Sequence, residues 1–229
     1  AVAAFRLPTM RAQISLPQDA PVRASSVEVD VGVQFLSGGG ASLQPVKLRS
    51  LVEPTGYASV TFPHAAFANG NVKEGLSRDD EMSDGFYELE NGTDPVAAGD
   101  LQNHARTQAA TLDPAGAARL TVGGLPQEDT LQALRLELDY QDANGVTQTV
   151  SRRVMLWPGQ RIPGIAITDW NARDALRYTL AVIDPTGKAV AGARVESDIY
   201  SVHAYSHRKR LIGGFYAYET TREVKRLAA

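Results

Sequence analysis

Apolar and polar residues alternate most regularly between residues 27 and 35. Val or Phe stands at every odd position there, and polar residues or Gly stand between them. This period of two puts one face of an extended strand in a core and the other in water, and it is incompatible with a helix. Similar alternation predicts strands over residues 10–16 and 134–140, and shorter apolar stretches predict strands over 46–52, 117–122 and 147–156.

Three Asp-x-x-Gly sequences separate apolar stretches, at residues 113–116, 142–145 and 184–187. Asp at the first position accepts a local backbone N–H, and Gly at the last position takes positive φ. Two of the turns also hold Pro at the second position, Pro114 and Pro185, which presets φ there. Together the turns predict a string of antiparallel hairpins.

Gly and Pro interrupt the chain elsewhere, at Gly38–Gly40, Pro126 and Pro158-Gly159, and no long window follows the helical period. The sequence therefore predicts an all-β protein. Strands with one apolar face must bury it against a second sheet, so we expect tandem antiparallel β-sandwiches of the fibronectin or immunoglobulin type. A closed barrel is the main alternative.

Two strand-rich blocks predict two domains. The first, residues 1–159, is a sandwich with a long insertion around residues 54–106, where alternation gives way to aromatic and acidic fragments. The second, residues 160–229, alternates from Ile165 to Val182 and continues past the Asp184 turn into Ala193 and Val195. It holds about four strands, whereas an independent sandwich has about seven, so we expect this domain to be incomplete.

Composition narrows the function. The 229 residues carry a net charge of −3, which disfavours nucleic acid and anionic membranes as partners. The absence of Cys excludes disulfides, thiolate metal sites and a thioester within these residues. No apolar run reaches the roughly 20 residues of a membrane-spanning helix. Because the chain begins Ala-Val-Ala-Ala, without Met or an export signal, we expect an excised piece of a larger protein or a processed form.

Candidate catalytic and metal sites are weak. Residues 79–84 hold four carboxylates that suit Ca²⁺, but their spacing fits no known loop, and a solvated loop explains them. His203 and His207 lie in strand-like sequence, with no Glu placed as a general base. Ser206 is a sequence neighbour of His207, which does not create a catalytic triad. We therefore predict no enzyme, no cofactor and no metal site.

The most distinctive stretch runs from Tyr205 to Tyr218. It joins a basic run to an alternating aromatic end, and it predicts either a solvated hairpin tip leading into a buried core strand or a dedicated binding patch. If exposed, the basic run is also a substrate for trypsin-like proteases. Ten residues form this candidate interaction or cleavage segment: Tyr205, Ser206, His207, Arg208, Lys209, Arg210, Gly213, Gly214, Phe215 and Tyr216.

This stretch, with residues 184–195 before it and 219–222 after it, resembles the large bacterial alpha-2-macroglobulin-like proteins. Residues 27–49, with a Ser-Gly-Gly turn at 37–39, resemble the paired strands of a macroglobulin-like domain, and residues 113–122 resemble a later turn and strand of it. The resemblance implies tandem seven-stranded sandwiches in a periplasmic, broad-spectrum protease inhibitor. A membrane anchor in a missing N-terminal part is left open. The implied partners are proteases, met through the full-length parent, and neighbouring macroglobulin-like domains of the same chain.

Members of that family expose a bait region whose cleavage collapses the array around the protease, and many then acylate the protease through a thioester. The thioester motif Cys-Leu-Glu-Gln matches no position of this sequence. The bait is left open between residues 54–106 and the basic run 208–210. The alternative function is a cell-surface adhesion or carbohydrate-binding module, and an enzyme is the third hypothesis. In the adhesion hypothesis, four aromatic residues form the binding face: Phe86, Tyr87, Tyr216 and Tyr218.

Overall fold

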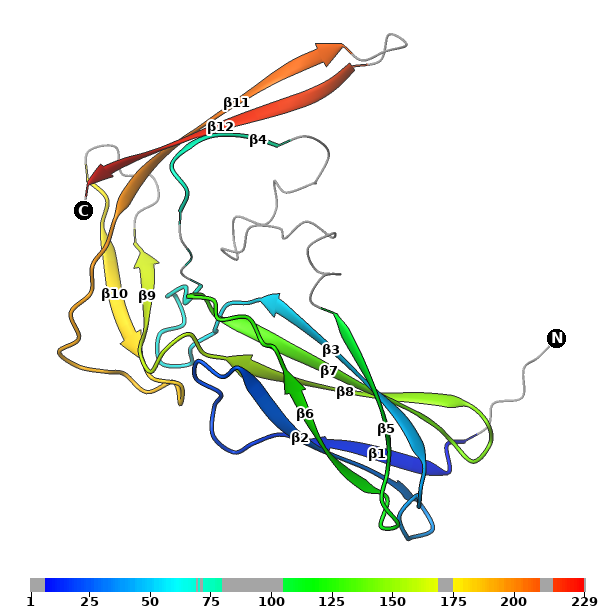
Figure 1. The fold of residues 1–229 in the computed structure, drawn as a ribbon. Coiled ribbons are helices and arrows are strands. Elements are labelled where there is room, and N and C mark those ends of the chain that lie inside the picture. The colour runs from blue at the N-terminus through cyan, green and yellow to red at the C-terminus, as the bar shows by residue number, and fades with distance from the viewer. Residues whose placement is uncertain are drawn as a thin grey trace.

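All regular elements of the described chain are strands (Figure 1). The structure is a computed structural model, and it describes residues 7–68, 70, 72–79, 105–168, 175–210 and 216–228. Strands that share a sheet pair antiparallel. The predicted all-β class is therefore confirmed. Within the described ranges, no helix is long and apolar enough to cross a membrane.

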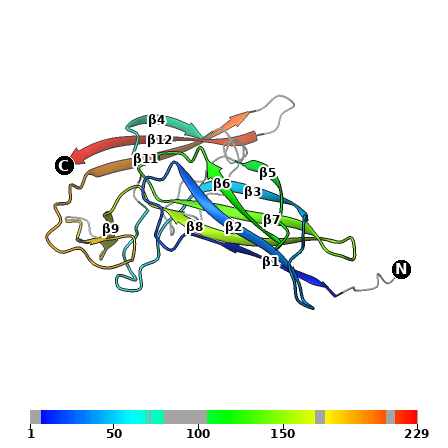
Figure 2. The same cartoon turned by 60° about the horizontal axis from the view of Figure 1, so that its bottom comes forward.

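Seven strands form two sheets that face one another (Figure 2). The three-stranded sheet has the order β1-β2-β6 and consists of β1 (Met10–Ser15), β2 (Ser26–Phe35) and β6 (Ala117–Gly123). The four-stranded sheet has the order β5-β3-β7-β8 and consists of β5 (Arg106–Thr111), β3 (Pro45–Pro54), β7 (Gln132–Gln141) and β8 (Thr147–Leu156). The six strands predicted in this part of the chain, three from alternation and three from shorter apolar stretches, are all present.

The inward side chains of the two sheets make one core. Val29 and Val33 of β2 are 0% and 1% exposed, and Leu136 and Leu138 of β7 are 0% exposed. Fully burying each such side chain stabilises the fold by roughly 1.5–3 kcal/mol relative to leaving it in water. The polar residues between them face outward, which is the arrangement that the period of two predicts and which confirms a sandwich.

All three Asp-x-x-Gly turns form as predicted. A carboxylate oxygen of Asp113 accepts hydrogen bonds from the N–H groups of Ala115 and Ala117, at 2.8 Å and 2.9 Å. Asp184 does the same with Thr186 and Lys188, at 2.9 Å and 3.0 Å. The last Gly of each turn has a φ between 78° and 81°. The Asp142 turn joins β7 to β8 in a hairpin, as expected.

The prediction of a hairpin at Asp113 is wrong, because this turn passes from β5 in one sheet to β6 in the other. The Ser-Gly-Gly turn likewise leads from β2 to β3 in the opposite sheet, so residues 27–35 and 45–49 are not paired strands. The two connections between the sheets, β2 to β3 and β5 to β6, are in close contact. A Cβ at Gly40 in the first would stand 1.8 Å from the carbonyl oxygen of Ala115 in the second. A turn sequence fixes the local reversal, and burial of the apolar faces then decides which sheet receives the next strand.

The described residues of the second block form four strands, which belong to two sheets. One is a hairpin of β9 (Ile162–Ile167) and β10 (Tyr178–Ile183). The other is a sheet of order β11-β12-β4, formed by β11 (Ile199–Arg210), β12 (Tyr216–Ala228) and β4 (Gly75–Asp79). The expected strand through Ala193 and Val195 is absent, because after the Asp184 turn the chain makes only a single bridge, from Ile183 to Ala189.

The predicted insertion joins the two blocks. It supplies β4 to the sheet of β11 and β12, and its aromatic residues enter a second core beside β9 and β10. Ala66 exchanges two backbone hydrogen bonds with Ile165, at 2.8 Å and 3.0 Å. Phe67 is 1% exposed and packs with Trp157 and Ile183. In Figure 1 this places β9–β10 at one end of the sandwich, with β11–β12 extending beyond them.

Candidate interaction surface

The structure places most of the candidate segment on the β11–β12 hairpin. Tyr205 to Arg210 form the second half of β11, and Tyr216 is the first residue of β12. Gly213, Gly214 and Phe215 lie outside the described residues. The register pairs Tyr205 with Thr221 and Arg208 with Tyr218 across the hairpin.

Strand-forming residues explain why this segment is extended. Val, Tyr, His and Ser alternate between the two faces of β11 without Gly or Pro, and Thr and Tyr recur in β12. Cross-strand polar contacts support the register. The hydroxyls of Ser206 and Thr220 are 2.9 Å apart, and the hydroxyl of Ser201 donates to the Lys225 carbonyl at 3.4 Å. Pairs of this kind each contribute a fraction of a kcal/mol.

The middle of the hairpin is exposed on both faces. Val202, Tyr205 and Tyr218 are 56%, 57% and 72% exposed, and every side chain from Val202 to Arg208 is exposed. The expectation that the aromatic end packs as a buried strand is thus wrong at Tyr218. The reason is that β11, β12 and β4 form a single sheet layer, whereas the sandwich has two layers with a core between them (Figure 1).

Ion pairs and ring contacts order the hairpin. Lys225 Nζ lies 2.6 Å from Glu223 Oε1, and this hydrogen bond lowers the pKa of the carboxyl and raises the pKa of the ammonium. Arg226 pairs with Asp198, which raises the pKa of the guanidinium. The rings of His203 and Tyr205 stack with centroids 6.4 Å apart. These contacts lie in solvent, so their contribution to stability is small.

Metal binding by the two β11 histidines is disfavoured by geometry. His203 and His207 share one face of the strand, but four residues of extended chain separate them by about 13 Å, too far for one ion. Among the described residues, no three His, Cys, Asp or Glu side chains gather as a metal site. The acidic residues Asp80, Glu81 and Asp84 and the aromatic residues Phe86 and Tyr87 lie outside the described ranges.

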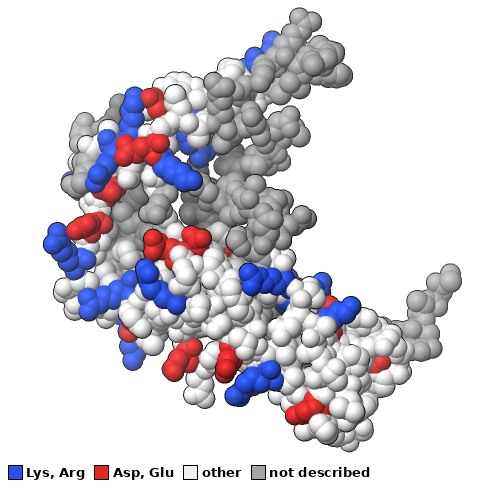
Figure 3. Space-filling model, in the orientation of Figure 1, with Lys and Arg blue, Asp and Glu red and all other residues white. Residues whose placement is uncertain are grey.

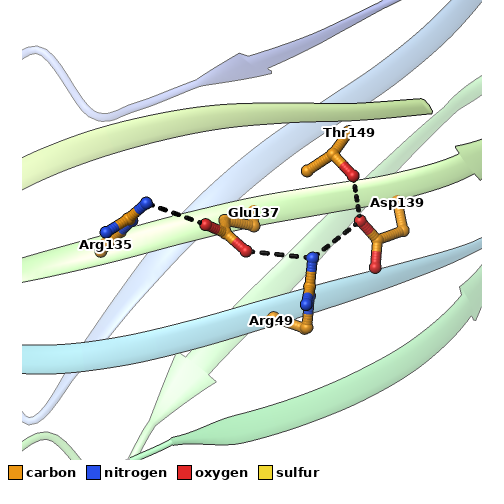
Figure 4. Close-up of polar contacts among 5 residues, drawn as sticks. All are labelled: Arg49, Arg135, Glu137, Asp139 and Thr149. Atoms are coloured by element: carbon orange, nitrogen blue, oxygen red, sulfur yellow. Dashed lines mark hydrogen bonds and ion pairs between the residues drawn. The ribbon is translucent and has the colours of Figure 1, made fainter.

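The outer face of the four-stranded sheet carries two adjacent carboxylates in an ion-pair network (Figure 4). Arg49 Nη2 lies 3.0 Å from both Glu137 and Asp139. Arg135 approaches Glu137 at 3.2 Å, and the Thr149 hydroxyl donates to Asp139 at 2.6 Å. Both carboxylates are therefore engaged by cations and support the sheet. Over the sandwich in Figure 3, acidic and basic side chains are likewise interspersed.

A recess of about 240 Å³ lies between the edges of β5 and β6, where the two sheets separate. Its floor includes Leu48 and Ser50, and Arg106 crosses beside it to donate to the Gly123 carbonyl at 2.6 Å. Among the described residues, eight line the recess, and none of them is Asp, Glu or His: Leu48, Ser50, Arg106, Thr107, Gln108, Thr121, Val122 and Gly123.

Sequence reasoning missed two residues that position this architecture. Phe67 lies in the stretch that lost alternation, and the only signal for its burial was the recurrence of aromatic residues at Tyr57, Phe62 and Phe67. The sequence marks Asp142 only as a turn residue, yet it is 3% exposed and also accepts hydrogen bonds from Thr9. No local pattern signals that second contact, because Thr9 lies far away along the chain.

Comparison with solved structures shows which known proteins share this fold. No protein-family model matches the sequence, and no curated protein matches it. Among solved structures, native alpha-2-macroglobulin of E. coli matches with a TM-score of 0.63 and 12% identity, over 97% of this chain and 14% of that chain. Salmonella alpha-2-macroglobulin reacted with methylamine matches with a TM-score of 0.65 and 12% identity, over 98% and 14% of the two chains.

The elastase-activated form of the E. coli protein also matches, with a TM-score of 0.57 and 14% identity, over 98% of this chain and 18% of that chain. The likeness covers nearly the whole sequence, including the hairpin, and it confirms the predicted macroglobulin-like fold. The chain itself spans only 14–18% of the length of these three proteins.

Proposed function

We propose that this chain is a structural part of a bacterial alpha-2-macroglobulin-like protease inhibitor and is not itself an enzyme. The observation that carries the proposal is the likeness in fold to bacterial alpha-2-macroglobulins over 97–98% of the chain. Two of the similar E. coli structures are of protein activated by trypsin and by elastase, which supports proteases as the partners of the parent. In this proposal the parent acts in the periplasm.

The proposed role of the chain is mechanical. A two-layer core of buried Val and Leu side chains makes the sandwich rigid, and the aromatic core ties β9–β10 to its end. We propose that residues 1–159 and 160–229 form two macroglobulin-like modules, of which the second is partial. The insertion in the first module contributes strand β4 and the buried Phe67 side chain to the second. Such modules suit an array that rearranges when proteolysis removes a restraint.

The test uses the full-length parent and trypsin. Limited proteolysis should change the mobility of the parent on a native gel, and the bound trypsin should lose activity on casein while it keeps activity on a small chromogenic peptide. Trypsin whose active-site serine has been blocked is the matched control, because it cannot cleave a bait. Unchanged mobility together with full activity on casein would contradict the proposal. A glycan array tests the adhesion alternative, for which the inhibitor proposal expects no binding.

A further inference from the structure

A loop that follows β3 contacts both the sandwich and the hairpin of β9 and β10. Among the described strands, β9 and β10 pair only with each other. The loop consists of residues 55–68, which we call the strap, and it is cyan in Figure 1. On the sandwich side, the Thr55 N–H donates to the Leu131 carbonyl at 3.0 Å. On the other side, Ala66 and Ile165 exchange backbone hydrogen bonds, so the strap bridges the two parts.

The strap has internal hydrogen bonds of its own. The Tyr57 N–H donates to the Phe67 carbonyl at 3.3 Å, which brings the two ends of the loop together. Between them, the Phe62 N–H donates to Ser59 Oγ and the Ala65 N–H donates to the Phe62 carbonyl, both at 3.1 Å. The rings of Tyr57 and Phe67 are thereby presented together, with centroids 6.1 Å apart.

Two glycines of the hairpin receive these two rings. A Cβ at Gly164 of β9 would stand 2.4 Å from a carbon of the Phe67 ring. A Cβ at Gly187, in the turn after β10, would stand 2.3 Å from the Tyr57 hydroxyl oxygen. Because close-packed interiors do not absorb such overlaps, a side chain at either position would displace a ring. The strap and the hairpin therefore fit together in one orientation.

The chain that enters β9 offers a hinge. Trp157 is fixed to the sandwich, since its N–H donates to the Pro21 carbonyl at 2.8 Å and its carbonyl accepts from the Arg23 N–H at 2.9 Å. Residues 159–161 then lead into β9, begin with Gly and continue with two exposed side chains. Hinges are commonly a few residues of this kind at the end of an element. The hairpin can turn there only if the strap lets go.

The core around the strap is much smaller than the core of the sandwich. Within the described chain, six buried hydrophobic side chains form the first and nineteen form the second. Local opening costs less free energy where fewer apolar contacts are broken. Release of the hairpin from the strap therefore requires less free energy than unfolding of the sandwich.

We propose that the strap is a clasp that holds β9–β10 in one orientation, and that release of Tyr57 and Phe67 lets the hairpin swing about residues 159–161 while the sandwich stays folded. The clasp gives the mechanical role proposed above a specific restraint within this chain. It is tested without a protease, so its failure leaves protease inhibition by the parent standing.

Distances between spin labels test the proposal on the whole chain. The chain has no Cys, so Ser26→Cys on β2 and Thr179→Cys on β10 place two nitroxide labels at exposed positions. With the clasp intact, pulsed electron paramagnetic resonance should give one narrow distance distribution. Phe67→Ala should widen the distribution at least about twofold, because a released hairpin takes several orientations. Val29→Ala removes a similarly buried side chain from the sandwich and should leave the distribution unchanged.

Hydrogen exchange followed by NMR separates release from general unfolding. In Phe67→Ala, the N–H of residue 165 should exchange at least about tenfold faster while β2 and β7 keep their protection. A disulfide between Ala66→Cys and Ile165→Cys, whose backbones pair directly, should reverse this change until it is reduced. Three results would each overturn the proposal: an unchanged distance distribution in Phe67→Ala, an equal loss of protection in β2 and β7, or a freely tumbling label at residue 179. A disulfide that forms without effect would do the same.

Discussion

A single buried carboxylate holds the start of the sandwich to the β7–β8 turn. Asp142 accepts hydrogen bonds from the N–H and the hydroxyl of Thr9, at 2.7 Å and 2.6 Å. The N–H groups of Met10 and Asn144 donate to it as well, at 3.3 Å and 3.0 Å. These bonds, the Thr9 hydroxyl first among them, lower the pKa of Asp142 to about 2. The ionised carboxylate is therefore part of the folded structure.

We expect Asp142→Asn to lower the melting temperature at pH 7 by several degrees, because an amide has no charge and turns a donor toward N–H groups. The pKa is lower in the folded state, so Asp142 stabilises the fold above about pH 4, and this contribution is lost as the pH falls toward 2. Thermal melts at pH 7 and at about pH 2.5, followed by circular dichroism, should show the gap between wild type and variant narrowing.

The control for this prediction is Asp129→Asn. Asp129 is exposed and pairs with Arg23 at 3.2 Å, so its loss should change the melting temperature little at either pH. A gap between Asp142→Asn and wild type that stays constant with pH would show that the carboxylate charge is not what holds Thr9.

At the scale of elements, most strands and all three Asp-x-x-Gly turns could be predicted, but only one of the predicted strand partners, the β7–β8 hairpin at the Asp142 turn, followed from the turn sequence. In both the Asp113 and the Asp142 turn the N–H of the Gly donates to the backbone carbonyl of the Asp, at 2.9 Å and 2.8 Å, yet one turn crosses between sheets and the other closes a hairpin. Adjacent residues determine the shape of a turn, whereas sheet membership depends on contacts far along the chain. The same limit hid the pairing of β4 with β12.

The candidate segment shows a related limit. Its alternation predicted extended chain, and Tyr205–Arg210 and Tyr216 do lie in the paired strands β11 and β12. The same alternation suggested burial for an aromatic end that is exposed at Tyr218. A period of two reports that a strand has two different faces. Whether a second layer covers one of them depends on elements elsewhere, and within the described chain no second sheet covers β11 and β12 at this point.

The pairing of β11 predicts how the basic run responds to trypsin. Arg208 and Lys209 are in register with Tyr218 and Ala217, and a protease binds its substrate as an extended chain without such partners. In the native chain we expect cleavage after Arg208 and Lys209 to be at least about tenfold slower than in a free peptide of residues 199–216, because the hairpin must open first. Mass spectrometry of timed digests measures both rates. Equal rates would contradict this prediction and favour residues 208–210 as the bait.

At the scale of the whole molecule, an aromatic joint connects the sandwich to β9–β10. The Tyr57 ring lies 5.4 Å from Trp157 and 6.1 Å from Phe67, measured between centroids. Gly164 of β9 lets the strand approach the Phe67 ring, since a Cβ there would stand 2.4 Å from a ring carbon. The joint therefore depends on the absence of a side chain at Gly164.

We expect Gly164→Ala to reduce the free energy of unfolding by about 1–3 kcal/mol, because the buried Phe67 ring must move to admit a methyl group. Gly123→Ala is the matched control, because beyond Gly123 and its two chain neighbours no heavy atom lies within 4 Å of the added Cβ. Denaturant titration measures the difference, and hydrogen exchange should show faster exchange in β9 and β10 while β2 and β7 keep their protection. Because the sandwich core and the aromatic core are separate clusters of side chains, we expect the substitution to destabilise β9 and β10 locally and to leave the sandwich folded. Equal losses in β2 and β7 would mean that the two cores unfold as one, and the joint would then be part of a single rigid body.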